Sequence, residues 1–156
     1  MVAKPKQKVI LLAEDDADDI YLITEAIDEC SLEARIFMVE NGEDLLDFLY
    51  HRNEFTEPAE SPRPDLILLD LNMPLKDGRE ALAEIKADPD LHNIPVIILT
   101  TSRAQEDIDI TYSLGASSFV SKPNSFKNLR ELVCKIGSYW LETVKLPEKT
   151  DQSDGG

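Results

Sequence analysis

A doubly wound α/β fold with a five-stranded parallel sheet is predicted by the way apolar and amphipathic segments alternate along the chain. Five short segments are rich in Val, Ile, Leu and Phe, and each is followed by a longer segment with apolar residues at helical spacing. Such alternation is typical of a mainly parallel sheet with helices on both faces. The composition agrees, because 42% apolar and 30% charged residues in a chain of 156 residues suit one folded domain.

Each expected strand follows from its apolar run. The runs KVILLA, PDLILLD and IPVIILT are almost wholly apolar, which predicts central strands that are buried on both faces, whereas EARIFMVE alternates more and suits an edge. The expected strands are residues 8–13, 33–40, 64–70, 94–100 and 116–121. Five strands in such a fold suit the flavodoxin-like order 2-1-3-4-5, with right-handed connections.

The helices are predicted from the spacing of their apolar residues, as with Ile20, Ile23 and Ile27 in the first helix. The expected helices are residues 16–30, 41–52, 77–87, about 103–113 and about 125–143. Asp18 and Asp19 then lie in a first helical turn, where negative charge interacts favourably with the helix dipole.

The remaining segments are expected to lie outside the sheet and its helices. Residues 53–64 hold three prolines and three glutamates, which predicts a surface loop. Residues 146–156 predict a disordered tail, and residues 1–7 a short N-terminal arm. The folded domain is therefore expected to span residues 8–145.

The net charge of −15 argues against sequence-independent binding to nucleic acid or to an anionic membrane, because both require Lys and Arg. No apolar run approaches the roughly 20 residues that span a bilayer, and the N-terminus lacks the long apolar stretch of a signal peptide. A cytoplasmic location is therefore expected. In that reducing compartment Cys30 and Cys134 are expected to be buried free thiols.

Polar side chains follow four of the predicted strands, at the edge of the sheet where open parallel sheets bind their ligands. Glu14 and Asp15 come directly after the first strand, and Asp70 ends the third. Because these two strands are neighbours in the predicted order, their three carboxylates are expected to meet. Thr100 ends the fourth strand, and Lys122 follows the fifth.

Three carboxylates in one pocket repel one another and need compensation. Two like charges about 4 Å apart cost about 4 kcal/mol at an effective dielectric constant of 20. A Mg²⁺ ion suits an all-oxygen site, and Lys122 offers an ammonium group. A metal and a lysine around one carboxylate suit phosphoryl chemistry, with Asp70 as the nucleophile and Thr100 as a hydrogen-bond donor. Thr101 and Ser102 are assigned to the loop that follows.

Four motifs carry a resemblance to a known family: AEDD, LLDLNMPLKDG, IILTTS and FVSKP occur in this order, each at a predicted strand end. Together they closely resemble the receiver domains of two-component response regulators, over residues 8 to about 143. The resemblance implies that Asp70 accepts a phosphoryl group from a histidine kinase and that Thr100 and Lys122 contact it. It also implies that Phe119 is a switch residue coupled to Thr100. In this family the second position after the threonine, here Ser102, can tune dephosphorylation.

The same resemblance implies a Mg²⁺ site. Asp15 would bind the ion directly, Glu14 through water, and Asn72 through its backbone carbonyl, beside Asp70. In this family the peptide bond that corresponds to Lys122–Pro123 is commonly cis.

The resemblance extends to partners. The protein is expected to be a stand-alone receiver without an output domain, and the chain looks like the small regulators that serve bacterial, especially cyanobacterial, phytochrome kinases. A histidine phosphotransfer protein is a possible further partner. Receivers often dimerise through the face formed by the fourth helix, fifth strand and fifth helix, and the apolar residues of 108–114 and of the last helix predict a homodimer through it.

Three other functions fit parts of this pattern. A phosphatase of the haloacid dehalogenase type also uses a strand-end aspartate, but Asn72 occupies the position where such enzymes carry a general acid. A flavin- or nucleotide-binding module needs a phosphate-binding loop, whereas EDDADD after the first strand repels phosphate. A phosphorylation-independent scaffold would not need the complete set of key residues that is present. His51 and His92 lie in polar segments and are not expected to be catalytic.

Overall fold

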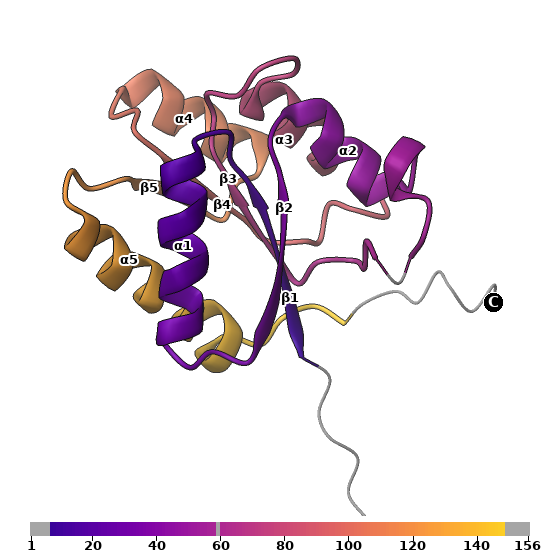
Figure 1. The fold of residues 1–156 in the computed structure, drawn as a ribbon. Helices are drawn as coiled ribbons and strands as arrows, with labels where there is room; N and C mark the ends of the chain where they lie inside the picture. The colour runs from indigo at the N-terminus through magenta and orange to yellow at the C-terminus, as the bar shows by residue number, and fades with distance from the viewer. Residues whose placement is uncertain (1–6, 59, 149–156) are drawn as a thin grey trace, which may run out of the picture.

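The computed structural model describes residues 7–58 and 60–148, and its centre is a five-stranded parallel sheet (Figure 1). The strand order is β2-β1-β3-β4-β5, so the predicted fold class and strand order are confirmed. The strands are β1 Lys8–Ala13, β2 Ala34–Val39, β3 Leu66–Leu69, β4 Val96–Thr100 and β5 Ser118–Ser121.

Five α-helices connect and follow the strands. They are α1 Ala17–Glu29, α2 Gly42–Tyr50, α3 Gly78–Ala87, α4 Gln105–Leu114 and α5 Phe126–Ser138. A 3₁₀ turn, η1 Asn53–Phe55, follows α2, and a π-helical turn, η2 Tyr139–Thr143, follows α5. The expected last helix, 125–143, therefore changes its hydrogen-bonding pattern after Ser138.

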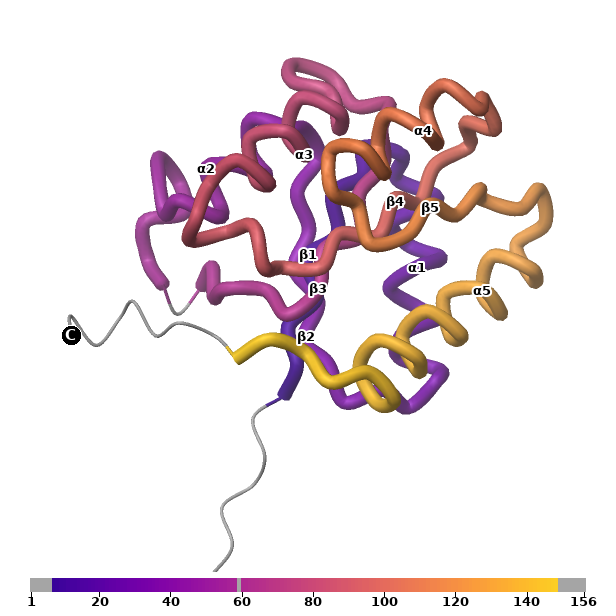
Figure 2. Tube along the Cα trace, turned by 180° about the vertical axis from the view of Figure 1, so that it is seen from behind, coloured from indigo at the N-terminus to yellow at the C-terminus, as the bar shows by residue number. Residues whose placement is uncertain are grey.

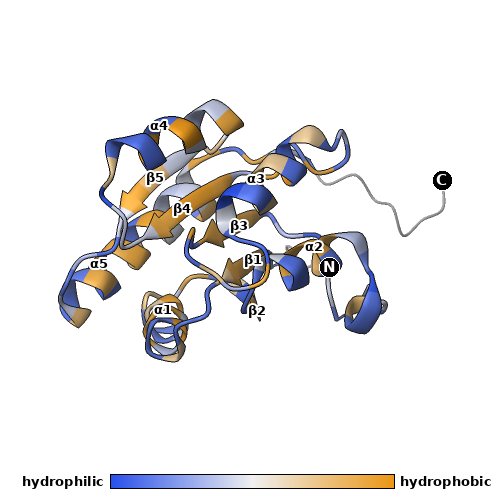
Figure 3. Cartoon of the chain, turned by 90° about the horizontal axis from the view of Figure 1, so that it is seen from above, coloured by the Kyte–Doolittle hydropathy of each residue, from blue (hydrophilic) through white to orange (hydrophobic). Residues whose placement is uncertain are grey.

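The helices cover the sheet in two layers (Figure 2). One core lies between the sheet and α1 with α5, and includes Ile10, Leu12 and Ile23. The other core lies on the opposite face, under α2 and α3, and includes Leu11 and Leu45. Successive residues of β1 thus enter different cores, which explains why the central strands are apolar throughout. In Figure 3 the strands are largely hydrophobic, whereas the helices around them carry both hydrophilic and hydrophobic residues.

Four of the five helices begin at a side chain that accepts a hydrogen bond from the first turn. Asp16, Asn41, Asp77 and Ser125 take this position at the starts of α1, α2, α3 and α5. Such caps satisfy backbone N–H groups that have no partner within the helix. Helix α4 differs, because its N-cap residue, Ala104, offers no side-chain hydrogen bond.

The loop expected over residues 53–64 is more anchored than its composition suggests. Ser61 is only 1% exposed, and its hydroxyl donates to the carbonyl oxygens of Phe55 and Glu57, each at 3.0 Å. The Nε2 atom of His51 lies 2.8 Å from the carbonyl oxygen of Ser61. Of the expected tail, residues 149–156 lie outside the described residues, as do residues 1–6 of the expected arm.

The prediction that Cys30 and Cys134 are free thiols is wrong, because the structure joins them in a disulfide across α1 and α5. Their Cα atoms are 5.8 Å apart, a separation typical of disulfides. Helix packing brings the two side chains together, and the spacing within each helix could not reveal this. No helix in the described part of the chain is long and apolar enough to cross a membrane.

Gly78 allows the start of α3 to pack directly against the backbone that follows β3. Its N–H donates to the carbonyl oxygen of Leu71 at 2.9 Å. A Cβ atom at this position would overlap the carbonyl oxygen of Asp70 and lie 2.8 Å from the Cα atom of Leu71. Only glycine fits here without a shift of the backbone.

We predict that Gly78→Ala lowers the free energy of unfolding by about 1–3 kcal/mol, because the added methyl group forces backbone atoms apart. Urea denaturation measures this change. Gly137→Ala is the matched control, because the three atoms nearest to an added Cβ there belong to the side chain of Leu32, which can turn away, and not to the backbone. Equal losses in the two variants would contradict the importance of the close approach at Gly78.

Candidate phosphoryl-acceptor site

The strand register brings the predicted site residues to one edge of the sheet. Ala13 of β1 pairs with Leu69 of β3, and the N–H of Asp70 donates to the carbonyl oxygen of Ala13 at 3.0 Å. Glu14 and Asp70 therefore leave neighbouring strands at the same height. On the other side, the N–H of Lys122 donates to the carbonyl oxygen of Thr100 at 2.7 Å.

Three carboxylates meet at this edge, as the sequence predicts. One oxygen atom each of Glu14, Asp15 and Asp70 lies within 4.8 Å of the other two. Glu14 and Asp70 are buried, whereas Asp15 is exposed. An all-oxygen donor set that is open on one side suits a hard divalent cation such as Mg²⁺, which retains several waters. These residues therefore fit the metal that the sequence implies.

The Lys122 ammonium group lies among carboxylates and is only 5% exposed. Its Nζ donates to Glu14, to Asp19 at 2.8 Å and to Asp70 at 3.4 Å. Burial disfavours the charged form, but the hydrogen bonds that Lys122 donates to Asp19 and Glu14 outweigh this effect and raise the pKa of Lys122. The ammonium group therefore stays charged at neutral pH and compensates the buried carboxylates.

Glu14 is the buried acid whose protonation changes near neutral pH. Burial raises its pKa to about 7, an effect that the hydrogen bond from Lys122 opposes and the charge of Asp70 reinforces. The backbone N–H groups of Asp15 and Asp16 donate to its Oε2 at 3.1 and 3.2 Å. Below neutral pH the Glu14 carboxyl is therefore mainly protonated.

Thr100 brings an unpaired hydroxyl to the end of β4. The residue is 0% exposed, and its Oγ1 is the one buried side-chain polar atom without a hydrogen-bond partner among the described residues. A buried hydroxyl normally has a partner, because leaving it unpaired costs about 1–3 kcal/mol. An oxygen-rich ligand at the site would provide the missing acceptor.

Asn72 and Phe119 lie at the margins of the site. Asn72 is exposed, and its N–H donates to Oδ1 of Asp70 at 3.3 Å. Phe119 is half-buried against the core beneath α2 and α3, and its N–H donates to the hydroxyl of Tyr112 at 3.1 Å. The Lys122–Pro123 peptide bond is trans, contrary to the expectation from the family, and trans is the more stable isomer of most X–Pro bonds.

Two residues at this edge, Asp19 and Ser102, make contacts that the sequence did not predict. Asp19 was expected only as a charge in the first turn of α1, yet it also binds Lys122. The sequence could have predicted this contact of Asp19. Asp16 is the N-cap of α1, which places Asp19 in the first turn of the helix, close to the strand ends. Ser102 was expected as a loop residue at a position that can tune dephosphorylation in the family, and its contact with Asp107, to which its hydroxyl donates at 2.6 Å, was not foreseen.

Comparison with known proteins identifies the family. The sequence model of the protein family described as the response regulator receiver domain matches residues 10–134 of this chain. The chain belongs to this family. Receiver domains bind divalent metal, which agrees with the carboxylate cluster of Glu14, Asp15 and Asp70.

Its relatives include regulators of cyanobacteria. Response regulator Rcp1 of Synechocystis is 44% identical over 140 residues, which cover 90% of this chain and 93% of the relative. The phosphorylated cyanobacterial phytochrome response regulator RcpA is 41% identical, with a TM-score of 0.86 over 92% of this chain and 100% of that one. The Mn²⁺-bound form of Rcp1 has a TM-score of 0.84 at 44% identity, over 90% of this chain and 99% of that one.

We predict that the affinity for Mg²⁺ rises about tenfold between pH 6 and pH 8, because a cation must displace the proton that Glu14 holds below neutral pH. Isothermal titration calorimetry at the two pH values measures this. The Glu14→Gln variant is the control and should lose most of the pH dependence, because an amide does not titrate. An equal affinity of the wild type at both pH values would show that Glu14 is ionised throughout.

Proposed function

We propose that this receiver takes up a phosphoryl group on Asp70. The observation that supports it best is a buried carboxylate at the end of a strand, with charged groups around it and an unpaired hydroxyl nearby. Asp70 lies within 3.4 Å of the Lys122 ammonium group and beside Glu14 and Asp15, and nearby Thr100 has a hydroxyl without a partner. Each of these groups can bind the oxygen atoms of a phosphoryl group on Asp70 or help to offset their charge.

In the proposed reaction an oxygen of Asp70 attacks the phosphorus atom of a phosphohistidine on the kinase. A P–O bond forms, the P–N bond of the donor breaks, and the donor histidine leaves with the bonding electron pair. Lys122 donates to the phosphoryl oxygens, and Thr100 gains the acceptor that its hydroxyl lacks. Asp15, Asp70, Glu14 through water and the Asn72 carbonyl would hold Mg²⁺, which would offset the charge of these oxygens.

The phosphoryl group on Asp70 then biases a conformational equilibrium. Thr100 ends β4, and Phe119 lies on the neighbouring strand, where Ile98 pairs with it. We assign Phe119 the role of the switch that follows a movement of Thr100. The half-buried position of its ring supports this assignment, because such a side chain can change its exposure without opening the core.

The proposed phosphodonor is a histidine kinase, and the similarity to Rcp1 and RcpA favours a phytochrome. A histidine phosphotransfer protein is a further candidate for exchange of the phosphoryl group. The protein acts in this proposal as a cytoplasmic signalling module and not as an enzyme with a turnover substrate. Asn72 supports that distinction, because its amide cannot act as the general acid of a phosphatase.

We predict that acetyl phosphate with Mg²⁺ adds one phosphoryl group to the wild type and none to Asp70→Asn, because the amide lacks a nucleophilic oxygen anion. Mass spectrometry of the intact protein measures the mass gain. Asp90→Asn, at an exposed position on a distant loop, is the matched control and should react like the wild type. No gain in the wild type would favour a phosphorylation-independent scaffold, and a gain in Asp70→Asn would move the acceptor elsewhere.

A homodimer through the face of α4, β5 and α5 is a second part of the proposal. Four large apolar or aromatic side chains of α4, α5 and the π-helical turn that follows α5 are each at least 45% exposed: Ile110, Tyr112, Phe126 and Tyr139. A two-fold axis through the face would place the same residues of two copies against each other. Burial of such side chains is the usual driving force of association.

We predict that Ile110→Asp weakens this dimer at least tenfold, because it places a charge in the apolar contact. Sedimentation velocity over a concentration series, with and without the phosphoryl group, measures the effect. Met38→Asp is the control, because Met38 is 47% exposed on β2 at the opposite edge of the sheet. A wild type that stays monomeric in both states would refute the dimer.

A further inference from the structure

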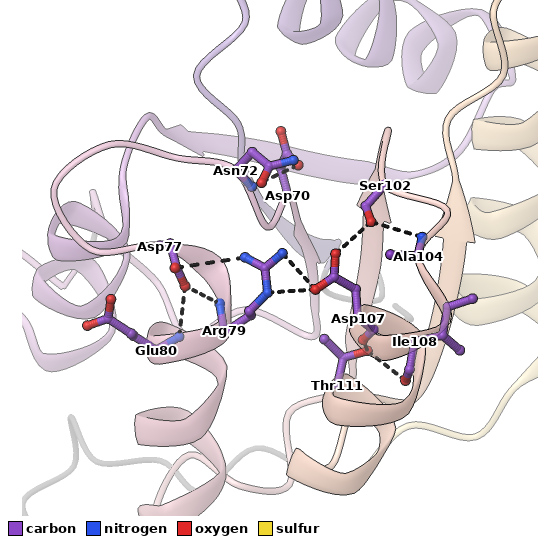
Figure 4. A network of polar contacts seen from close by, with 10 residues as sticks. All are labelled: Asp70, Asn72, Asp77, Arg79, Glu80, Ser102, Ala104, Asp107, Ile108 and Thr111. Carbon is purple, nitrogen blue, oxygen red and sulfur yellow. Dashed lines mark hydrogen bonds and ion pairs between the residues drawn. The ribbon is translucent and has the colours of Figure 1, made fainter.

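A chain of polar contacts links helices α3 and α4 next to the acceptor site (Figure 4). Arg79, in the first turn of α3, directs Nε and Nη2 at the same oxygen of Asp107, at 2.9 and 2.8 Å. The other oxygen of Asp107 accepts the hydroxyl of Ser102 at 2.6 Å. We call this set the Arg79–Asp107–Ser102 bridge. It joins residues that are 28 positions apart.

Ser102 connects the bridge to the segment that carries Thr100 and to the strand before Lys122. Its hydroxyl accepts from the N–H of Ala104 at 3.3 Å, and its carbonyl oxygen accepts the hydroxyl of Ser121 at 3.1 Å. Ser102 lies two residues after Thr100, and Ser121 directly precedes Lys122. One loop residue is therefore fixed both to α4 and to β5.

Arg79 connects the other end of the bridge to Asp70. The preceding residue, Gly78, packs against the carbonyl group of Asp70 and donates to Leu71. The start of α3 can therefore not move without disturbing the backbone that carries the acceptor. The bridge therefore holds three backbone segments at fixed positions relative to one another. They are the segment from Asp70 to the start of α3, the loop after Thr100, and the end of β5 before Lys122.

The bridge also fixes the loop before α4, a helix that has no side-chain cap. The N-cap residue Ala104 has no polar side chain that could bind the loop. Instead, the carboxylate of Asp107 accepts a hydrogen bond from the hydroxyl of Ser102 in that loop. The hydrogen bonds from Ser102 and Arg79 lower the pKa of Asp107, so the charged form persists at neutral pH. The side chains of Arg79 and Asp107 are 28% and 17% exposed, so water screens them less than a pair at the open surface.

We infer that the Arg79–Asp107–Ser102 bridge positions Thr100 and Lys122 relative to Asp70 and so sets the rate of phosphoryl transfer. Arg79, Asp107 and Ser102 are positioning residues, since none of their described polar contacts is with Asp70, Thr100 or Lys122 itself. Arg79 also forms an ion pair of 3.8 Å with Asp77, the N-cap of α3. The inference rests on the proposed phosphoryl acceptance by Asp70. A displacement of about 1 Å at a reacting centre can cost up to a hundredfold in rate, so loss of the bridge should be measurable.

The test compares Arg79→Ala, Ser102→Ala and the double variant R79A/S102A, using acetyl phosphate at saturating concentration with Mg²⁺. The two substitutions break different links of one path and do not touch each other. Each is expected to slow phosphorylation about three- to tenfold, and the double variant no more than the slower single variant. Arg79→Lys, which keeps one charged donor, should lie closer to the wild type.

Two further measurements separate positioning from a general loss of structure. The affinity for Mg²⁺ should stay within about twofold of the wild type, because none of the bridge residues provides a metal ligand. The matched control is Arg130→Ala, which removes an ion pair of 3.3 Å between α5 and α1, away from the strand ends. Its phosphorylation rate should be unchanged.

Three outcomes would overturn the inference. Single variants that react at the wild-type rate would show that the bridge does not position the site, and effects that multiply in the double variant would show that its two links act independently. A rate loss in Arg130→Ala equal to that in Arg79→Ala would show that the slower phosphorylation comes from a general loss of stability and not from positioning. A wild type that takes up no phosphoryl group would instead overturn the proposed function, and the inference with it.

Discussion

The buried Lys122 ammonium group is the interaction on which the site depends. Glu14 and Asp70 are both nearly inaccessible to water, and two such carboxylates side by side would repel each other strongly in a medium of low dielectric constant. Lys122 touches both and draws Asp19 to the same point. Because the charge balance comes from a side chain, the pocket can remain folded before a metal or a phosphoryl group arrives.

The parallel sheet supplies the geometry for that interaction. Asp70 and Glu14 leave adjacent strands, whereas Lys122 leaves the edge strand β5, two positions away from β3. A long side chain is needed to reach across the end of β4, and lysine provides that length together with a charge. Thr100 occupies the gap at the end of β4. The strand order thus determines which residue type can serve at each position.

Much of this arrangement could be predicted from the sequence, since its signals are local. Asp70 stood out because a carboxylate directly follows a wholly apolar strand, and Lys122 because it precedes a proline at a strand end. The disulfide between Cys30 and Cys134 could not be predicted, because it depends on how α1 packs on α5. The bridge from Arg79 to Asp107 was missed for the same reason. In the sequence, Arg79 and Asp107 each resemble an ordinary charged residue on the solvent-exposed side of a helix.

The hydrogen bond between the Tyr112 hydroxyl and the Phe119 N–H has a consequence for how copies of this protein can meet. Strand β5 is the outer strand of the sheet, and it is only four residues long. One of its free backbone donors is occupied by a side chain of α4. Short strands with masked backbone groups resist the edge-to-edge pairing that leads to aggregation. In the proposed dimer, the contact at this edge would therefore be made by side chains and not by pairing of the two sheets.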